Sequence, residues 1–219
     1  MNTLFLDIAS NKASLALIKD GQTLIIRHLD HRISDADLIP LVEDVLKESA
    51  WTYKDLTHLA CVTGPGGFTS LRVGVAFANT LASQLQIPMA GVHLSDLYAA
   101  RVPSPGASRH PLPSAGEGTN VEDFLWLHST KKHEIFIRGF GSLKNIAPEA
   151  RCEKIEEIIP KIPEASLWTG ELIDEHKQAI EPRGMKAIPL RSLEEALPSF
   201  LQALPYTHDL LVPWYGRMW

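Results

Sequence analysis

A glycine-rich stretch at residues 64–74 contains the residue types that could bind a charged ligand. It reads Gly-Pro-Gly-Gly-Phe-Thr-Ser-Leu-Arg-Val-Gly and joins an apolar segment at residues 58–63 to a helical pattern at residues 71–86. Such a turn can hold a phosphate, because its unpaired N–H groups and the positive end of the helix dipole favour an anion. The spacing matches neither common phosphate-binding glycine motif, which favours a purely structural turn.

Other side chains with reactive chemistry are sparse. Asp7 is the one carboxylate at a predicted strand end in the first half that suits a metal–nucleotide complex. The nine histidines include no pair four residues apart on a predicted helix, so we expect no metal site. Cys61 lies inside an apolar strand without a nearby base, and Cys152 is too distant in sequence to favour a disulfide. The residues therefore predict no catalytic centre.

The composition excludes several classes of protein. With 45% hydrophobic and 21% charged residues, the 219-residue chain can bury a sizeable core. It contains no apolar run near the roughly 20 residues of a membrane span, and no basic segment precedes its apolar N-terminus. A net charge of −5 without a dense basic patch argues against direct nucleic-acid binding. We expect a cytoplasmic protein that does not contact a membrane.

The elements that position the glycine turn follow from the hydrophobic pattern. Strands are predicted at residues 2–8, 14–18, 22–27, 58–63 and 88–92, and helices at 35–50, at 71–86 and from 95. This order predicts a mixed sheet covered by helices.

The second half has a different organisation. Residues 102–120 are rich in proline and lack apolar periodicity, which is typical of a flexible linker or insertion. Two further strands are predicted at residues 124–127 and 134–137. We therefore expect an N-terminal lobe at residues 1–101, a linker at 102–121 and a C-terminal lobe at 122–219.

Both long helices carry unusually broad apolar stripes. On the second helix, Phe77, Leu81 and Leu85 form a bulky ridge beside a ridge of small residues that would let another backbone approach closely. Two interpretations stay open, an association surface between helices or one ordinary core. The residues assigned to the association surface are Leu38, Leu41, Val42, Val45, Leu71, Gly74, Val75, Ala78 and Ala82. On that interpretation, Gly74→Leu would abolish partner binding and leave the monomer folded.

The stretch at residues 64–74 resembles a motif of the TsaB (YeaZ) family, G-P-G-S-F-T-G-L-R-I-G, with Gly67 and Ser70 at its two variable places. Weaker matches lie at Leu6-Asp7, residues 37–40, 134–136 and 213–217. The chain departs from the family at residues 6–9, where members read I-D-T-S, and at 129–136, where they read D-A-R-R-x-E-V-Y.

The resemblance implies an α/β fold of the actin-like ATPase type (ASKHA, ribonuclease H-like), with two related lobes that each contain a mixed sheet flanked by helices. It implies a non-catalytic subunit of the complex that makes threonylcarbamoyladenosine in tRNA. A helical bundle would bind a TsaD-like catalytic subunit, a TsaE-like ATPase would join the complex, and tRNA would be contacted only indirectly. Without its partner the chain would form a homodimer.

The departures imply a degenerate nucleotide site. Its vestigial residues would be Asp7, Gly64, Gly66 and Gly67. No cofactor would bind strongly to this chain alone, and ATP or ADP would bind only at the junction with a partner. The alternative functions are a free-standing ATPase or phosphotransferase of the same fold and a glycoprotease-like metallohydrolase.

Overall fold

The computed structural model describes residues 1–10, 13–29, 35–103 and 122–216. They form two compact units, the first built from Met1–Leu94 and Leu193–Tyr215 and the second mainly from Ser95–Ser192. The expected C-terminal lobe at 122–219 therefore needs a correction, because Leu193–Tyr215 belongs to the first unit. Residues 104–121 of the expected linker lie outside the described residues.

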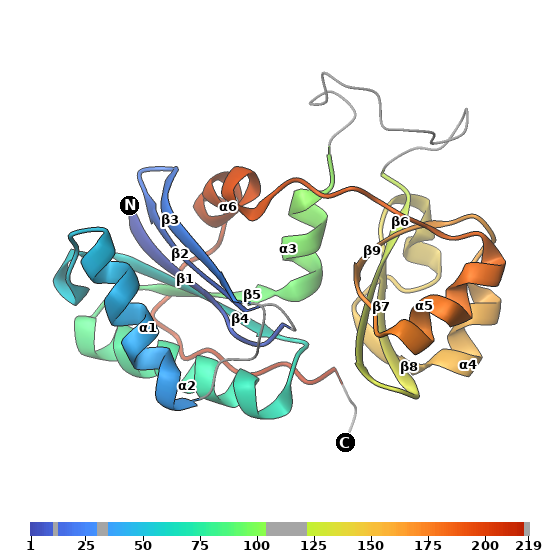
Figure 1. Cartoon of the computed structure of the whole chain (residues 1–219), viewed down its shortest axis with the longest axis horizontal. Helices are drawn as coiled ribbons and strands as arrows, with labels where there is room; N and C mark the ends of the chain where they lie inside the picture. The colour runs from blue at the N-terminus through green and yellow to red at the C-terminus, as the bar shows by residue number, and fades with distance from the viewer. Residues whose placement is uncertain (11–12, 30–34, 104–121, 217–219) are drawn as a thin grey trace. The chain divides into compact units, whose positions relative to one another are not determined.

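A five-stranded mixed sheet is the centre of the first unit, with the strand order β3-β2-β1-β4-β5 (Figure 1). The strands are β1 (Asn2–Asp7), β2 (Ala13–Lys19), β3 (Gln22–Leu29), β4 (His58–Gly64) and β5 (Met89–His93). The first three form an antiparallel meander, and β4 and β5 run parallel to β1. The five strands predicted for this half are confirmed.

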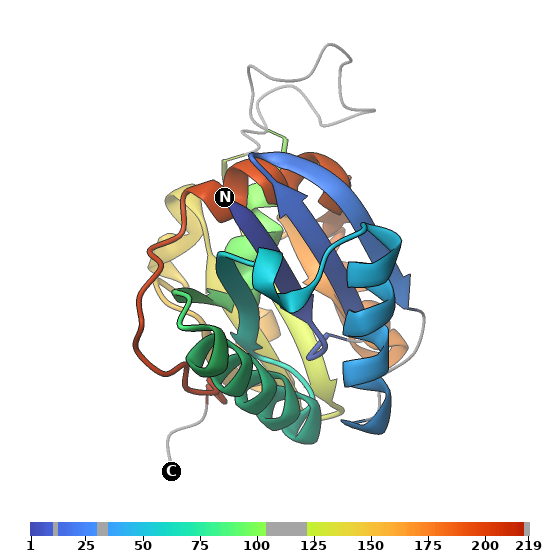
Figure 2. The same cartoon turned by 90° about the vertical axis from the view of Figure 1, so that its left-hand side faces the viewer.

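Two long helices, α1 (Asp35–Glu48) and α2 (Phe68–Leu85), cover one face of this sheet (Figure 2). Helix α2 begins three residues before its predicted start, because the chain is already helical at Phe68 after the non-helical Gly67. It ends at Leu85, because the next residue, Gln86, has a left-handed backbone with φ +56°. Helix α6 (Leu193–Gln202) packs on β3 from the opposite face (Figure 1).

An extended segment, Thr207–Tyr215, follows α6 and is called the strap below. Thr207 exchanges two backbone hydrogen bonds with Met89 at the open edge of β5, at 2.7 and 2.9 Å. Farther along, the Trp214 N–H donates to the Thr63 carbonyl at 2.7 Å. These bonds, and the packing of α6 on β3, are the physical reason why the last part of the chain belongs to the first unit.

The second unit repeats the same plan. Its sheet has the order β10-β9-β6-β7-β8, in which β6, β7 and β8 form an antiparallel meander and β9 and β10 are parallel to β6. The strands are β6 (Phe124–Lys131), β7 (Glu134–Gly139), β8 (Arg151–Lys154), β9 (Leu167–Glu171) and β10 (Lys186–Ala187). If the strands of each unit are numbered by their order in the chain, both sheets have the same spatial order across the sheet: third, second, first, fourth, fifth. The expected α/β fold with two related lobes is confirmed.

The helices of the second unit are short. They are α3 (Leu94–Arg101), α4 (Ile155–Ile158) and α5 (Asp174–Ile180). Its 3₁₀ turns are η2 (Gly141–Asn145), η3 (Ile159–Lys161) and η4 (Glu181–Arg183), whereas η1 (Tyr53–Asp55) lies in the first unit. Within the described ranges, no helix has the length and apolar character needed to cross a membrane.

Candidate functional site

The glycine turn is packed between two other backbones of the first unit. Gly64 has φ +144°, and a Cβ atom built on it would collide with the Trp214 carbonyl of the strap. A Cβ atom on Gly66 would collide with the Ala9 carbonyl, which also accepts the Gly67 N–H at 3.1 Å. Close approach of the chain's own backbone thus explains why these positions are glycine.

Asp7 holds the loop that follows its own strand. Its Oδ1 accepts the N–H groups of Ala9 and Ser10 at 3.2 and 3.1 Å, and its Oδ2 accepts the Ser10 hydroxyl at 2.5 Å. Both carboxylate oxygens of this buried side chain are therefore used within the loop. These bonds stabilise the turn beside Gly66. The Asp7 carboxylate thus acts as in a local Asx turn and not as a metal ligand.

The thiol of Cys61 is buried in β4. Burial, and next the negative charge of Asp7, raise the pKa of this thiol well above its usual range. A protonated, inaccessible thiol is a poor nucleophile. Among the described residues, no three histidine, cysteine, aspartate or glutamate side chains converge in a way that could hold a metal ion.

The residues assigned from sequence to an association surface lie in the core of the first unit. Leu41 is half-buried, and the other eight are buried. The eight are Leu38, Val42, Val45, Leu71, Gly74, Val75, Ala78 and Ala82. This corrects the assignment, because side chains that hold α1 and α2 onto the sheet cannot also contact another protein directly.

The ridge of small residues on α2 packs against the sheet. The sequence had also suggested a second helix as its neighbour. A Cβ atom on Gly74 would lie 2.9 Å from Ile8 Cγ1 and 3.8 Å from Cys61 Sγ. This contact argues against the expectation that Gly74→Leu leaves the monomer folded, since a leucine side chain there must displace Ile8 from the space between α2 and the sheet.

A partly exposed flank of α2 carries the bulky ridge. Val73, Phe77, Leu81 and Leu85 are half-buried and pack against the edge of the core. Ile39 on α1, which covers the same face of the sheet, is 50% exposed. The sequence contains a signal for this row, because Phe77, Leu81 and Leu85 are large apolar residues at helical spacing beside the ridge of small residues.

An aromatic cluster lies at the start of α2. The Phe68 ring is 49% exposed, with the Arg72 guanidinium carbon 3.9 Å from its centroid. Arg72 Nε donates to the Tyr215 hydroxyl at 3.2 Å, and the Phe68 and Tyr215 ring centroids are 5.2 Å apart. Sequence reasoning missed this cluster, because Tyr215 lies 143 positions from Arg72 and no local pattern links them.

Comparisons with known proteins identify the relatives. A family model described as TsaD, tRNA N6-adenosine threonylcarbamoyltransferase, matches residues 30–136. The TsaB of Buchnera aphidicola is 21% identical over 90% of this chain and 96% of its own length. The TsaB of Escherichia coli is 36% identical over 42% of this chain and 40% of its own length. The chain is therefore similar both to TsaB (YeaZ) proteins and to the TsaD family model.

Other relatives show how far the match extends beyond the TsaB family. A tRNA N6-adenosine threonylcarbamoyltransferase of Moorella thermoacetica is 25% identical over 72% of the chain. The matched regions span 40% of the Escherichia coli TsaB and 50% of the Moorella transferase. Two Pseudomonas aeruginosa structures share the fold at 21% identity. One, described as similar to peptidase YEAZ, has a TM-score of 0.69 over 99% of both chains, and YeaZ itself 0.62 over 92% of both.

Two polar pairs in the second unit contain a buried histidine, His176 in one and His128 in the other. The Ser129 hydroxyl donates to His176 Nδ1 at 2.7 Å, because His176 Nε2 must donate to the Lys132 carbonyl at 2.8 Å. Ser129 and His176 are only 2% and 1% exposed, so the pair ties α5 to the β6–β7 hairpin. A substrate has no access to the serine hydroxyl.

The second pair consists of His128 on β6 and Glu171 on β9. His128 Nδ1 lies 3.9 Å from Glu171 Oε2, and the Tyr98 hydroxyl donates to Glu171 Oε1 at 2.8 Å. Burial lowers the pKa of His128 to about 4, so its ring is neutral at pH 7. The ring stacks on Trp126 with an interplanar angle of 4°. A neutral, stacked histidine serves as packing here.

Proposed function

We propose that this chain is a non-catalytic subunit in the biosynthesis of tRNA threonylcarbamoyladenosine, and that it binds a TsaD-like catalytic subunit through the outward faces of α1 and α2. Similarity to TsaB proteins supports the pathway, since these relatives are named for it. One structural observation supports the surface. The row Val73, Phe77 and Leu81 on α2 is left half-buried on the face that α1 and Ile39 share.

The outward faces suit a helical partner. The buried stripes fix α1 and α2 on the sheet, so a partner would meet preformed helices and lose little conformational freedom on binding. A half-buried phenylalanine at the centre of an apolar row is the kind of anchor that dominates binding energy at protein interfaces. The proposed contact is therefore a bundle in which the partner's helices cover Ile39, Val73, Phe77 and Leu81.

The non-catalytic part of the proposal is supported by how the reactive groups are used. Asp7 caps its own loop, the glycines accommodate neighbouring backbone, and Cys61 is a buried thiol with a raised pKa. A free-standing ATPase or a metallohydrolase would need converging carboxylates or histidines, and no described arrangement favours either. Asp7, Gly64, Gly66 and Gly67 remain proposed as a vestigial nucleotide site, with ATP or ADP bound only at a partner junction.

The rest of the proposal rests on the family resemblance alone. A TsaE-like ATPase would join the complex, tRNA would be contacted through the partner, and the chain would form a homodimer through the same helices when the partner is absent. An exposed apolar surface of this kind favours some form of association.

The test is the affinity of the purified chain for the TsaD-like protein of the same organism, measured by isothermal titration calorimetry. We expect binding by the wild type and at least about tenfold weaker binding by Phe77→Ala, because truncation removes the central anchor. The matched control is Leu24→Ala, which truncates a side chain that is 44% exposed on β3, away from both helices. Absence of wild-type binding, or equal affinity of both variants, would overturn the proposal.

A further inference from the structure

The last two residues of the strap, Trp214 and Tyr215, close over the glycine turn. The Trp214 N–H donates to the Thr63 carbonyl at 2.7 Å, which brings the strap beside the end of β4. The Trp214 carbonyl then fills the space next to the Gly64 Cα in which any other residue would have its Cβ atom. Glycine permits a close approach of this kind, which can serve a ligand. At Gly64 the approaching group belongs to the chain itself.

The next glycine of the turn is filled by a second backbone carbonyl. The Ala9 carbonyl takes the corresponding space at Gly66 and accepts the Gly67 N–H at 3.1 Å. Ala9 is held in turn by Asp7, whose Oδ1 accepts its N–H at 3.2 Å. Both groups that enter the turn are therefore carbonyl oxygens, which accept hydrogen bonds and cannot donate them. A phosphate beside them would meet acceptors only and would find the Gly67 N–H already bonded.

Aromatic side chains hold the end of the strap in this place. The Trp214 ring meets the His93 ring at the end of β5 edge to face, with centroids 4.5 Å apart. The Tyr215 hydroxyl accepts the Arg72 Nε–H at 3.2 Å, and its ring centroid is 5.2 Å from that of Phe68. Arg72 is the one cationic residue of α2. The cation that this helix could offer to an anion is thus engaged by the strap.

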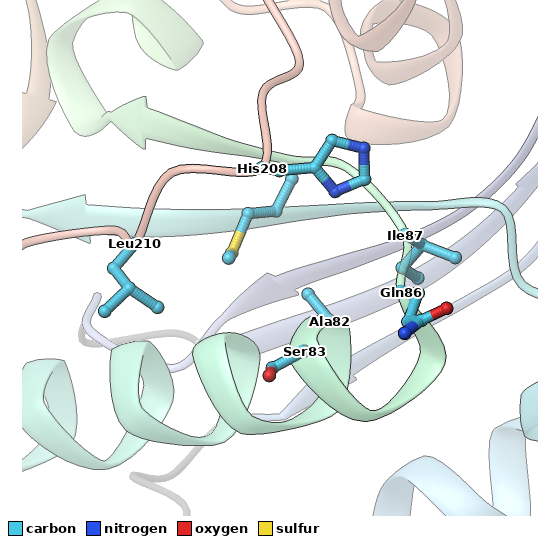
Figure 3. Close-up of a pocket in the computed structure, with 7 residues that line it drawn as sticks. Ala82, Ser83, Gln86, Ile87, His208 and Leu210 are labelled. Atoms are coloured by element: carbon cyan, nitrogen blue, oxygen red, sulfur yellow. The ribbon is translucent and has the colours of Figure 1, made fainter.

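The strap does not press against α2 along its whole length. Beside the last turns of the helix, a pocket of about 360 Å³ remains between them (Figure 3). His208 and Leu210 line it from the strap, and Ala82 and Ser83 line it from the helix. The close contact at the glycine turn is therefore not a general result of the strap's course along α2. It depends on the last two residues of the strap.

We infer that Trp214 and Tyr215 form an internal plug, which takes the place that an anionic ligand would have at the glycine turn between β4 and α2. The inference rests on the proposed function only in that it deepens the vestigial nucleotide site, which includes Gly64, Gly66 and Gly67. With the plug seated, ATP or ADP at a partner junction would take its phosphate ligands from the partner and not from this turn.

The first test follows the backbone amide of Trp214 by hydrogen exchange in the full chain. Tyr215→Ala removes the contacts with Arg72 and Phe68. We expect the Trp214 amide to exchange at least about tenfold faster in this variant, because its bond to β4 opens more often. Val212→Ala is the matched control, since it truncates a side chain of the same strap that is 75% exposed, and its rate should equal that of the wild type. Equal rates in Tyr215→Ala and the wild type would overturn the inference.

The second test titrates the isotope-labelled chain with inorganic phosphate and with Mg²⁺–ADP, and NMR follows the amide signals of Gly64, Gly66 and Gly67. We expect no saturable shift of these signals in the wild type, because the plug and the Ala9 carbonyl fill the turn. Saturable shifts would show that the turn holds a phosphate and would overturn the inference.

Failure of the plug and failure of the proposed function are distinguishable, because both tests of the plug are made without a partner. If phosphate shifts the glycine signals while the TsaD-like protein binds the wild type more tightly than Phe77→Ala, the plug is overturned and the proposed function stands. If the glycine signals stay unchanged, Tyr215→Ala speeds exchange and no partner binds, the plug is supported and the proposed function is overturned.

Discussion

The two units share one strand order but differ in the helices on their sheets. In the first unit, α1 and α2 have 14 and 18 residues and run along the sheet. In the second, α4 and α5 have 4 and 7 residues and cover only their local core. The long helices bury one stripe against their sheet and leave a continuous outward face for the partner contact proposed above, whereas the short helices of the second unit offer little continuous outward face.

The largest effect is expected from a substitution that disturbs the contact of α2 with its sheet. Gly74→Leu should destabilise the first unit by about 3 kcal/mol or more, because its side chain must displace Ile8 from a filled core. The better helix propensity of leucine offsets only about 1 kcal/mol. The measurement is the free energy of unfolding in urea.

Ala76→Leu is the control for this prediction, since it adds the same bulk to the exposed side of the same helix. Its stability should match that of the wild type. Equal stability of Gly74→Leu and Ala76→Leu would show that the small ridge is not pressed against the sheet.

A second prediction concerns the core of the second unit and its response to acid. The pKa of His128 is lowered to about 4 in the folded protein, below its ordinary value of 6.5, because burial disfavours the charged ring. The unfolded chain therefore binds the extra proton first. Stability is complete above pH 6.5 and should fall by about 3 kcal/mol as the pH drops towards 4.

The measurement is the free energy of unfolding at several pH values between 7.5 and 4.5. His128→Phe keeps an aromatic ring next to Trp126 and removes the titrating group. Its stability should depend less on pH over this range than that of the wild type. Parallel curves for the two proteins would contradict the buried, neutral state of His128.

The smallest effect is expected from a substitution that removes the hydrogen bonds between the strap and α2. Asn79→Ala removes the two hydrogen bonds to Leu211 and should cost about 1–2 kcal/mol. Hydrogen exchange of the Leu211 amide should accelerate, because its acceptor is lost. Thr80→Ala is the control on the same helix, since the Thr80 hydroxyl bonds only back to Ala76. Unchanged exchange at Leu211 would show that the strap is held elsewhere.

The sequence was sufficient for the five strands of the first unit, for β6 and β7 and for the two long helices, because their apolar periodicity is strong and local. It also placed the glycine turn between β4 and α2. It did not predict the short strands β8, β9 and β10. Helical periodicity could not show which ridge of α2 faces the sheet, since Gly74 and Phe77 both belong to a broad apolar stripe. That choice depends on the neighbouring Ile8 side chain, which leaves room for glycine only.

The strap shows a different limit. Its contacts pair Leu211 with Asn79 and Tyr215 with Arg72, at separations of 132 and 143 positions. Nothing in the sequence of α6 reveals that it packs on β3 at the start of the chain. The placement follows from which sheet edge and face remain uncovered, and this is a property of the assembled fold.

The division of the chain also fixes an order of completion during synthesis. Residues 95–192 leave the ribosome before α6 and the strap, although the first unit began to emerge earlier. The second unit can therefore close while the edge of β5 still has no Thr207 beside it. An uncovered strand edge is a template for pairing with other chains, so the first unit is most exposed to aggregation in the interval before its last residues are made.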